Sequence, residues 1–273
     1  GGGGGGSETP APSTPPPTIS FSANPTSVLV GSESTLTWSS SNASSCAASG
    51  AWSGSRPTSG SENVTITTVG DSSFTITCSG EGGSSSSMVT IEGFRQTDGV
   101  VVDGYITGAD VFIDENANFI ADATENSTTS DNEGKFTIKY ADGNLVSLGG
   151  TDLDSQTLLD NLLITHKLAG HSEFKAITPV TSVAAFMQDA SSINSTLGID
   201  ASIDIFTFDP VANKGDGGIY DYLYEKGNQL TVLAFALQNI TNNINASTDT
   251  TQDYFKAISE EIEKEYNETL TKV

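Results

Sequence analysis

The residues with the clearest potential for chemistry lie between positions 114 and 125. Oxygen-bearing side chains occupy positions 1, 3, 5, 9 and 12 of this stretch: Asp114, Asn116, Asn118, Asp122 and Glu125. Position 7 is Ile120, which would offer its backbone carbonyl. A hard cation such as Ca²⁺ binds six to eight oxygens, and a Glu at the last position can bind through both of its oxygens. The spacing therefore predicts a calcium-binding loop of the EF-hand type.

Two features of this stretch depart from a true EF-hand. Loop position 6 is Phe119 rather than Gly, although a left-handed backbone at this sharp turn costs a non-glycine residue about 1–2 kcal/mol. The flanking segments 100–113 and 127–138 alternate between apolar and polar residues, which predicts strands and turns instead of two helices. We therefore expect calcium in a loop of a β-module; the alternative is a polar surface loop whose acids only face water.

The composition argues against several classes of function. The 273 residues include 34 acidic and 11 basic side chains, giving a net charge of −23 spread along the chain. Such a charge repels phosphate backbones, so no nucleic-acid partner is expected, and it suits surroundings rich in screening cations. The sequence contains no run of 18 apolar residues, so no membrane span is expected. The two histidines, His166 and His171, do not share a helical face, and no familiar catalytic motif occurs, so we expect no enzymatic activity.

The two cysteines, Cys46 and Cys78, are separated by 32 positions and form no metal-binding pair motif. Cys78 shares one face of an alternating strand with Phe74 and Ile76, which places it toward a core. A disulfide fits this pattern better than two buried free thiols. It would indicate an oxidising compartment: the periplasm, the cell surface or the medium.

Composition and periodicity divide the chain into four parts. Residues 1–17 are a Gly- and Pro-rich tether, and residues 18–92 alternate as short strands between turn signals. Residues 93–170 contain the calcium loop, and residues 171–273 change to a helical period. The expected fold class is multidomain β plus α, with an Ig-like β-sandwich, a second small β-sandwich and a C-terminal α-helical domain.

The segments expected to complete the second and third domains can be placed. Strands at 144–148 and 162–166 are expected to join the calcium-binding module. Thr178 followed by Pro179 predicts a helix start. Apolar residues at spacings of 3, 4 or 7 predict one long amphipathic helix: Ile219, Leu223, Leu230, Leu233, Leu237, Ile240 and Ile244. Thr251 is expected to cap a last helix with an apolar stripe.

Short strings in residues 18–92 resemble the Ig-like repeats of bacterial surface proteins. The strings are Ala23-Asn24-Pro25, Leu36-Thr37-Trp38, Ser45-Cys46 and Thr75-Ile76-Thr77-Cys78. The order differs from antibody domains, because Trp38 precedes the first cysteine. Trp52, in a Gly/Ser-rich loop, is either a cover for the disulfide or a platform for stacking a sugar ring.

The run Gly-Ala-Asp-Val-Phe-Ile-Asp-Glu-Asn-Ala-Asn, with Asp122, Glu125 and the string at 129–136, resembles a calcium-binding B-type repeat of bacterial surface adhesins. It is also similar to the carboxypeptidase regulatory-like β-sandwich, and the resemblance covers about residues 98–140. In such modules the ion stiffens a stalk and performs no catalysis. The N-terminal glycine run resembles the sequence after the lipidated cysteine of outer-membrane lipoproteins, which implies a lipid anchor as the link to a membrane.

These features predict a non-enzymatic extracellular subunit of a bacterial surface assembly or filament, stiffened by Ca²⁺. Residues 1–22 are expected to mediate self-association by adding a strand to a neighbouring copy. The alternative is a surface-tethered adhesin or carbohydrate-binding lipoprotein that binds glycans or other surface proteins. It would use Trp52, Tyr105 or the cluster of Tyr220, Tyr222 and Tyr224.

Overall fold

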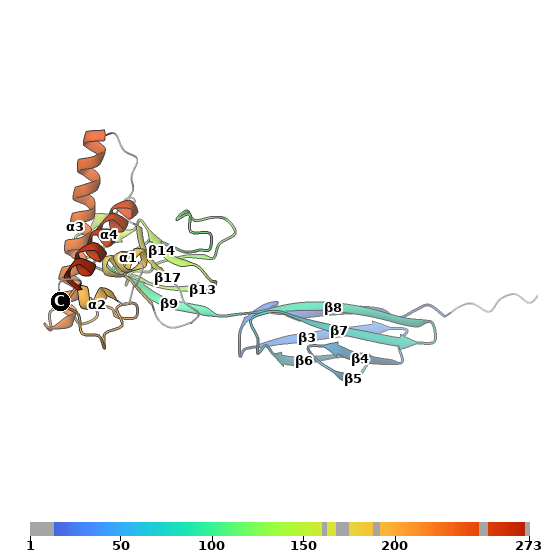
Figure 1. Cartoon of the computed structure of the whole chain (residues 1–273). Helices are drawn as coiled ribbons and strands as arrows, with labels where there is room; N and C mark the ends of the chain where they lie inside the picture. The colour runs from blue at the N-terminus through green and yellow to red at the C-terminus, as the bar shows by residue number, and fades with distance from the viewer. Residues whose placement is uncertain (1–13, 160–162, 168–174, 188–191, 246–250, 271–273) are drawn as a thin grey trace, which may run out of the picture. The chain divides into compact units, whose positions relative to one another are not determined.

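The computed structural model describes residues 14–159, 163–167, 175–187, 192–245 and 251–270 (Figure 1). The chain is mostly β, in several sheets, with a few helices. It divides into two compact units, Gly1–Arg95 and Gln96–Val273. The predicted β-rich character, with a few helices, is therefore confirmed at this coarse level.

From residue 14 onward, unit 1 contains two sheets. The first has the order β1-β3-β6, with β1 at Thr18–Asn24, β3 at Glu33–Ser41 and β6 at Ser59–Thr65. The second has the order β2-β8-β7-β4-β5, formed by Ser27–Leu29, Gly83–Phe94, Gly70–Gly80, Ser45–Gly50 and Gly54–Arg56. All pairs are antiparallel except β2 with β8.

One core joins the two sheets of unit 1. Alternation along β3 and β7 places Leu36 and Trp38 from one sheet against Phe74 and Ile76 from the other. All four side chains are at most 4% exposed, as expected where successive residues of a strand point to opposite faces. Cys78 continues this row into the core, as its pattern predicted.

The described part of unit 2 contains three small sheets. The order β13-β9-β18 uses Lys135–Lys139, Gln96–Val101 and Lys175–Ile177; the order β10-β15-β16 uses Ile106–Thr107, Thr151–Asp152 and Thr157–Leu158. The order β12-β11-β14-β17 uses Ser127–Thr129, Asp110–Asp114, Asn144–Leu148 and Leu163–Lys167. The strands β14 and β17 correspond to those expected at 144–148 and 162–166.

Four helices lie in the described residues of unit 2: α1 at Pro179–Phe186, α2 at Ile193–Thr196, α3 at Ile219–Asn245 and α4 at Thr251–Leu270. The start of α1 is the predicted one. The Thr178 hydroxyl accepts from the Thr181 amide at 3.1 Å, and the Thr181 hydroxyl accepts from the Thr178 amide at 2.8 Å. Pro179 occupies the first turn, where a missing N–H is harmless.

The expected division into a β-module and a separate helical domain differs from the structure. One core cluster contains both sheet residues, such as Val101 and Phe136, and helix residues, such as Val183 and Phe255. The strand β18 also returns from the expected helical domain to pair in parallel with β9. The small sheets cannot enclose a core alone, so the helices cover them within one unit. The first boundary falls at 95/96 rather than 92/93, because β8 continues to Phe94.

Candidate calcium site

The strand β11 ends at Asp114 and the strand β12 begins at Ser127, so the candidate loop connects two antiparallel strands. The Ile113 amide donates to the Asn126 carbonyl at 3.0 Å and closes the base of the loop. The first candidate ligand, Asp114, is 1% exposed, whereas the Ile120 side chain is 62% exposed. The frame is thus the β-hairpin that the flanking alternation predicted, not a helix pair.

The first half of the loop folds around the Asp114 carboxylate. One oxygen, Oδ1, accepts from the Asn118 amide at 3.1 Å, and the other, Oδ2, accepts from the Phe119 amide at 3.1 Å. The Asn116 side-chain oxygen accepts from the Asn118 amide at 3.0 Å. The Asn118 side-chain oxygen accepts from the Ile120 amide at 2.7 Å. The chain therefore wraps around the carboxylate at loop position 1.

The second half of the loop returns to the same point. The Asp122 Oδ2 accepts from the side-chain amides of Asn116 at 2.8 Å and Asn118 at 2.9 Å. The two Glu125 oxygens accept from the backbone amides of Glu115 at 2.9 Å and Asp122 at 3.1 Å. The structure thus brings together the side chains at positions 1, 3, 5, 9 and 12.

This donor set fits a hard cation. It supplies three carboxylates, two side-chain amides and the backbone carbonyl of Ile120, all oxygen donors that Ca²⁺ prefers over nitrogen or sulfur. Among the described residues, no group of three or more His, Cys, Asp and Glu side chains forms a metal cluster by itself. The proposed site accordingly depends on its two Asn residues and a backbone oxygen as well as on its acids.

Phe119 adopts the left-handed backbone that the loop requires at position 6, with φ of 59°. Its ring packs against the buried cluster of Phe112 and Val146 in the adjoining sheet. It also contacts Phe186 of α1, with 5.9 Å between ring centroids. These contacts offset the cost of the backbone conformation and explain why a large residue stands where Gly is usual. Sequence periodicity gave no signal for them, because Phe186 is distant along the chain.

The disulfide of unit 1 is present. Cys46 and Cys78 are direct partners across β4 and β7 and are bonded, with an S–S distance of 2.03 Å. The register of β4 and β7 places Cys46 directly opposite Cys78, with both side chains on the same face of the sheet.

Trp52 is not available as a stacking platform. It is 7% exposed, and its ring stacks on Phe21 with 5.7 Å between ring centroids. Trp38 and Phe74 make T-shaped contacts with it, with centroids 5.5 and 6.2 Å away. The indole N–H donates to the Thr75 carbonyl at 3.0 Å. This indole belongs to the core cluster that contains the disulfide, which is the position expected if Trp52 covers the disulfide. A sugar ring needs an exposed aromatic face, and Trp52 offers none.

Unit 2 also contains a charged cluster that the sequence analysis missed. The Asp154 carboxylate pairs with the Lys214 ammonium at 2.5 Å and accepts from the Tyr224 hydroxyl at 2.9 Å. The Lys214 ammonium lies 3.9 Å from the Tyr224 ring centroid. The hydrogen bond from Lys214 lowers the pKa of Asp154, and the same contact raises the pKa of Lys214. These residues come from three separate segments, so their spacing carries no sequence signal.

Neither histidine is placed at a site by the structure. His166 lies in β17, opposite Leu145 in register, and His171 is outside the described residues. None of the described helices is both long and apolar enough to cross a membrane.

Comparisons with known proteins give no family. No protein-family profile matches the chain, and no curated protein matches it. A structure of three N-terminal domains of the bacteriophage RB49 highly immunogenic outer capsid protein is similar at 9% identity and a TM-score of 0.24, over 55% of this chain and 68% of that one. The Bacillus anthracis TIE protein is similar at 9% identity and a TM-score of 0.21, over 58% and 39%. Similarities this weak carry no argument about fold or function.

Proposed function

We propose that this protein is a non-enzymatic structural subunit of an extracellular bacterial surface assembly, and that Ca²⁺ bound by residues 114–125 stiffens its second unit. The observation that carries this proposal is the hydrogen-bonded loop formed by the side chains at loop positions 1, 3, 5, 9 and 12: Asp114, Asn116, Asn118, Asp122 and Glu125. These side chains carry the carboxylate and amide oxygens that Ca²⁺ prefers as ligands.

The compartment follows from the chemistry of unit 1 and of the whole chain. A structural disulfide such as Cys46–Cys78 persists where thiols are not kept reduced, which favours a location outside the cytoplasm. A net charge of −23 is tolerated best where dissolved cations screen it. We therefore place the protein at the bacterial cell surface, with unit 1 as an Ig-like module of the exposed part.

Self-association is the second element of the proposal. Residues 18–24 already pair within the chain, as the edge strand β1 against β3, and residues 1–13 lie outside the described part. Strand exchange would therefore transfer β1, or the tether before it, to the sheet of a neighbouring copy. Deleting residues 1–17 should abolish polymers, and polymers that persist in that variant would refute exchange through this segment.

Electron microscopy of the protein with calcium, and then with chelator, tests the proposal as a whole. Regular filaments or sheets that are lost in chelator would support a calcium-dependent structural role. Single particles in both conditions would contradict the assembly role and leave calcium binding to be judged separately. The adhesin alternative gains no support from Trp52, because its ring is buried.

A further inference from the structure

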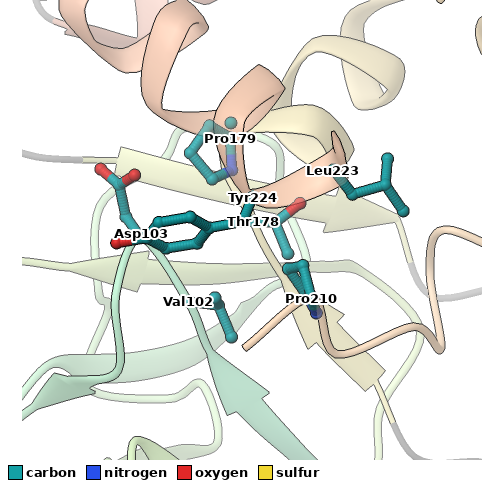
Figure 2. A pocket seen from close by; sticks show the side chains of 8 residues that line it. Val102, Asp103, Thr178, Pro179, Pro210, Leu223 and Tyr224 are labelled. Atoms are coloured by element: carbon teal, nitrogen blue, oxygen red, sulfur yellow. The ribbon is translucent and has the colours of Figure 1, made fainter. Parts of the chain in front are cut away.

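Helix α3 has one face that packs within unit 2. Leu223, Thr231 and Ala234 are at most 7% exposed, and with Gly227 they follow one another at helical spacing. A Cβ added at Gly227 would lie 3.6 Å from Pro179, at the start of α1. Figure 2 shows Leu223 and Pro179 lining the same pocket beneath the first turns of α3. This face of the helix is therefore already occupied.

Other apolar side chains of the same helix are exposed. Val232 is 68% exposed and Leu233 is 46% exposed, although covered residues precede and follow them. In the sequence, Leu or Ile residues follow Leu230 at alternating steps of 3 and 4, at positions 233, 237, 240 and 244. This is the a and d spacing of a heptad, which is typical of a helix that pairs with another helix.

The same part of α3 carries no charge. Residues 227–248 include no Asp, Glu, Lys or Arg, whereas residues 96–273 together contain 28 acidic and 9 basic side chains. Two copies of so acidic a unit repel each other over most of their surface. An approach through residues 227–245 sets no charged side chain of one α3 against the α3 of the other copy. A strongly charged partner, by contrast, would find no opposite charge on this segment.

The uncharged part of α3 also has the shape for such an approach. Figure 1 shows the C-terminal half of α3 extending beyond α1 and the sheets of unit 2. The stretch 227–245 has about five turns and a length of about 28 Å. A pair of helices in contact over this length forms an interface at the small end of the range for proteins, so a dissociation constant in the micromolar range is expected.

We propose that the C-terminal half of α3, with Leu233 in the contact, pairs with the same helix of a second copy of this chain. A contact made by the same surface on both copies closes on itself, so it produces dimers. It differs from the strand exchange proposed above, because it uses neither residues 1–22 nor the calcium loop. Burial of Leu233 and its neighbours would supply the free energy of association.

Sedimentation equilibrium of the full chain in chelator, up to about 100 μM, tests the proposal. Leu233→Glu places a carboxylate in the contact on both copies and should raise the dissociation constant at least about tenfold. The matched control is Leu158→Glu, which adds the same charge at a leucine of β16 that is 64% exposed. The control should leave the dissociation constant within about twofold of the wild type.

A wild type that stays monomeric over the whole series would overturn the proposal. Association that Leu233→Glu leaves at the strength of Leu158→Glu would belong to another surface, such as residues 1–22, and would also overturn it. These outcomes are separate from the fate of strand exchange, which the deletion of residues 1–17 tests.

Salt gives a second measurement, which uses the wild type alone and does not depend on how a variant folds. Raising NaCl from about 0.05 M to about 0.5 M should strengthen the dimer, because it screens the repulsion between two acidic chains. An uncharged contact has no ion pairs for the salt to weaken. A dimer that dissociates as the salt is raised would overturn the α3 contact.

Discussion

Trp52 lies between a stacked ring and a guanidinium, and this decides what it can do. Phe21 stacks on the indole, and the Arg56 guanidinium lies 4.7 Å from its centroid while pairing with Glu62 at 2.9 Å. A large aromatic side chain enclosed in this way contributes to unfolding free energy through buried area and edge contacts. Its role is therefore one of stability.

Trp52→Ala should lower the free energy of unfolding of unit 1 by about 3–5 kcal/mol, because it leaves a cavity among the ring contacts. Met88→Ala is the matched control, since Met88 lies in the same unit and is 62% exposed. That change should stay within about 0.5 kcal/mol. Urea denaturation measures both, and a Trp52→Ala chain as stable as Met88→Ala would contradict the buried placement.

At the scale of elements, the loop and α1 are connected through Phe119. Its amide donates to Asp114 while its ring contacts Phe186, so one residue contributes both to the loop and to the helix packing. The loop is thus part of the cover of unit 2 and is not an isolated surface feature. Ion binding in the loop would act on the helices through this contact.

The left-handed backbone at Phe119 gives a signed prediction. Both Phe119→Ala and Phe119→Gly lose the ring, but only Gly avoids the backbone cost, so the Gly variant should be more stable by about 1 kcal/mol. Ile120 is an exposed neighbour whose φ is not positive. There the order should reverse, with Ile120→Ala more stable than Ile120→Gly. Urea unfolding in chelator measures both pairs, and the same order at both sites would contradict the loop geometry.

At the scale of the whole molecule, the two units have separate cores. The cluster around Trp38 and Phe74 shares no residue with the cluster around Val101 and Phe255. Each unit should therefore unfold in a transition of its own, and changes in one core should leave the other transition in place.

The disulfide tests this independence. Replacing Cys46 and Cys78 together by Ala should lower the stability of unit 1 by about 3–4 kcal/mol, the loop-entropy expectation for a separation of 32 residues. The transition of unit 2 should not move. Differential scanning calorimetry resolves the two, and a joint shift of both transitions would show that the units are coupled.

Local sequence patterns predicted much of this architecture, but they could not predict its long-range contacts. The alternation of Phe74, Ile76 and Cys78 was sufficient to place Cys78 in a core, and Thr178-Pro179 was sufficient to start α1. The parallel pairing of β18 with β9 joins distant segments, and periodicity carries no information about it. Leu233 shows a related limit, since it belongs to the predicted apolar stripe of α3 but is 46% exposed. The helical period identifies which residues share a face, but not which of them another element covers.

The loop followed the same rule. The spacing from Asp114 to Glu125 identified the side chains that converge, since tight loops direct alternate residues inward. In the spacing alone, Phe119 is a departure from the EF-hand pattern. The spacing does not show what its ring packs against, because those partners come from β11, β14 and α1.

Residues 114–125 are expected to bind calcium, and isothermal titration of the full chain with Ca²⁺ measures this binding. Wild type and Glu115→Gln should show binding at this loop, because the Glu115 side chain is exposed and outside the ligand set. Glu125→Gln removes a carboxylate oxygen at the last position and should weaken binding at least about tenfold, or about 1.4 kcal/mol. No binding by the wild type, or equal binding by Glu125→Gln, would contradict the account.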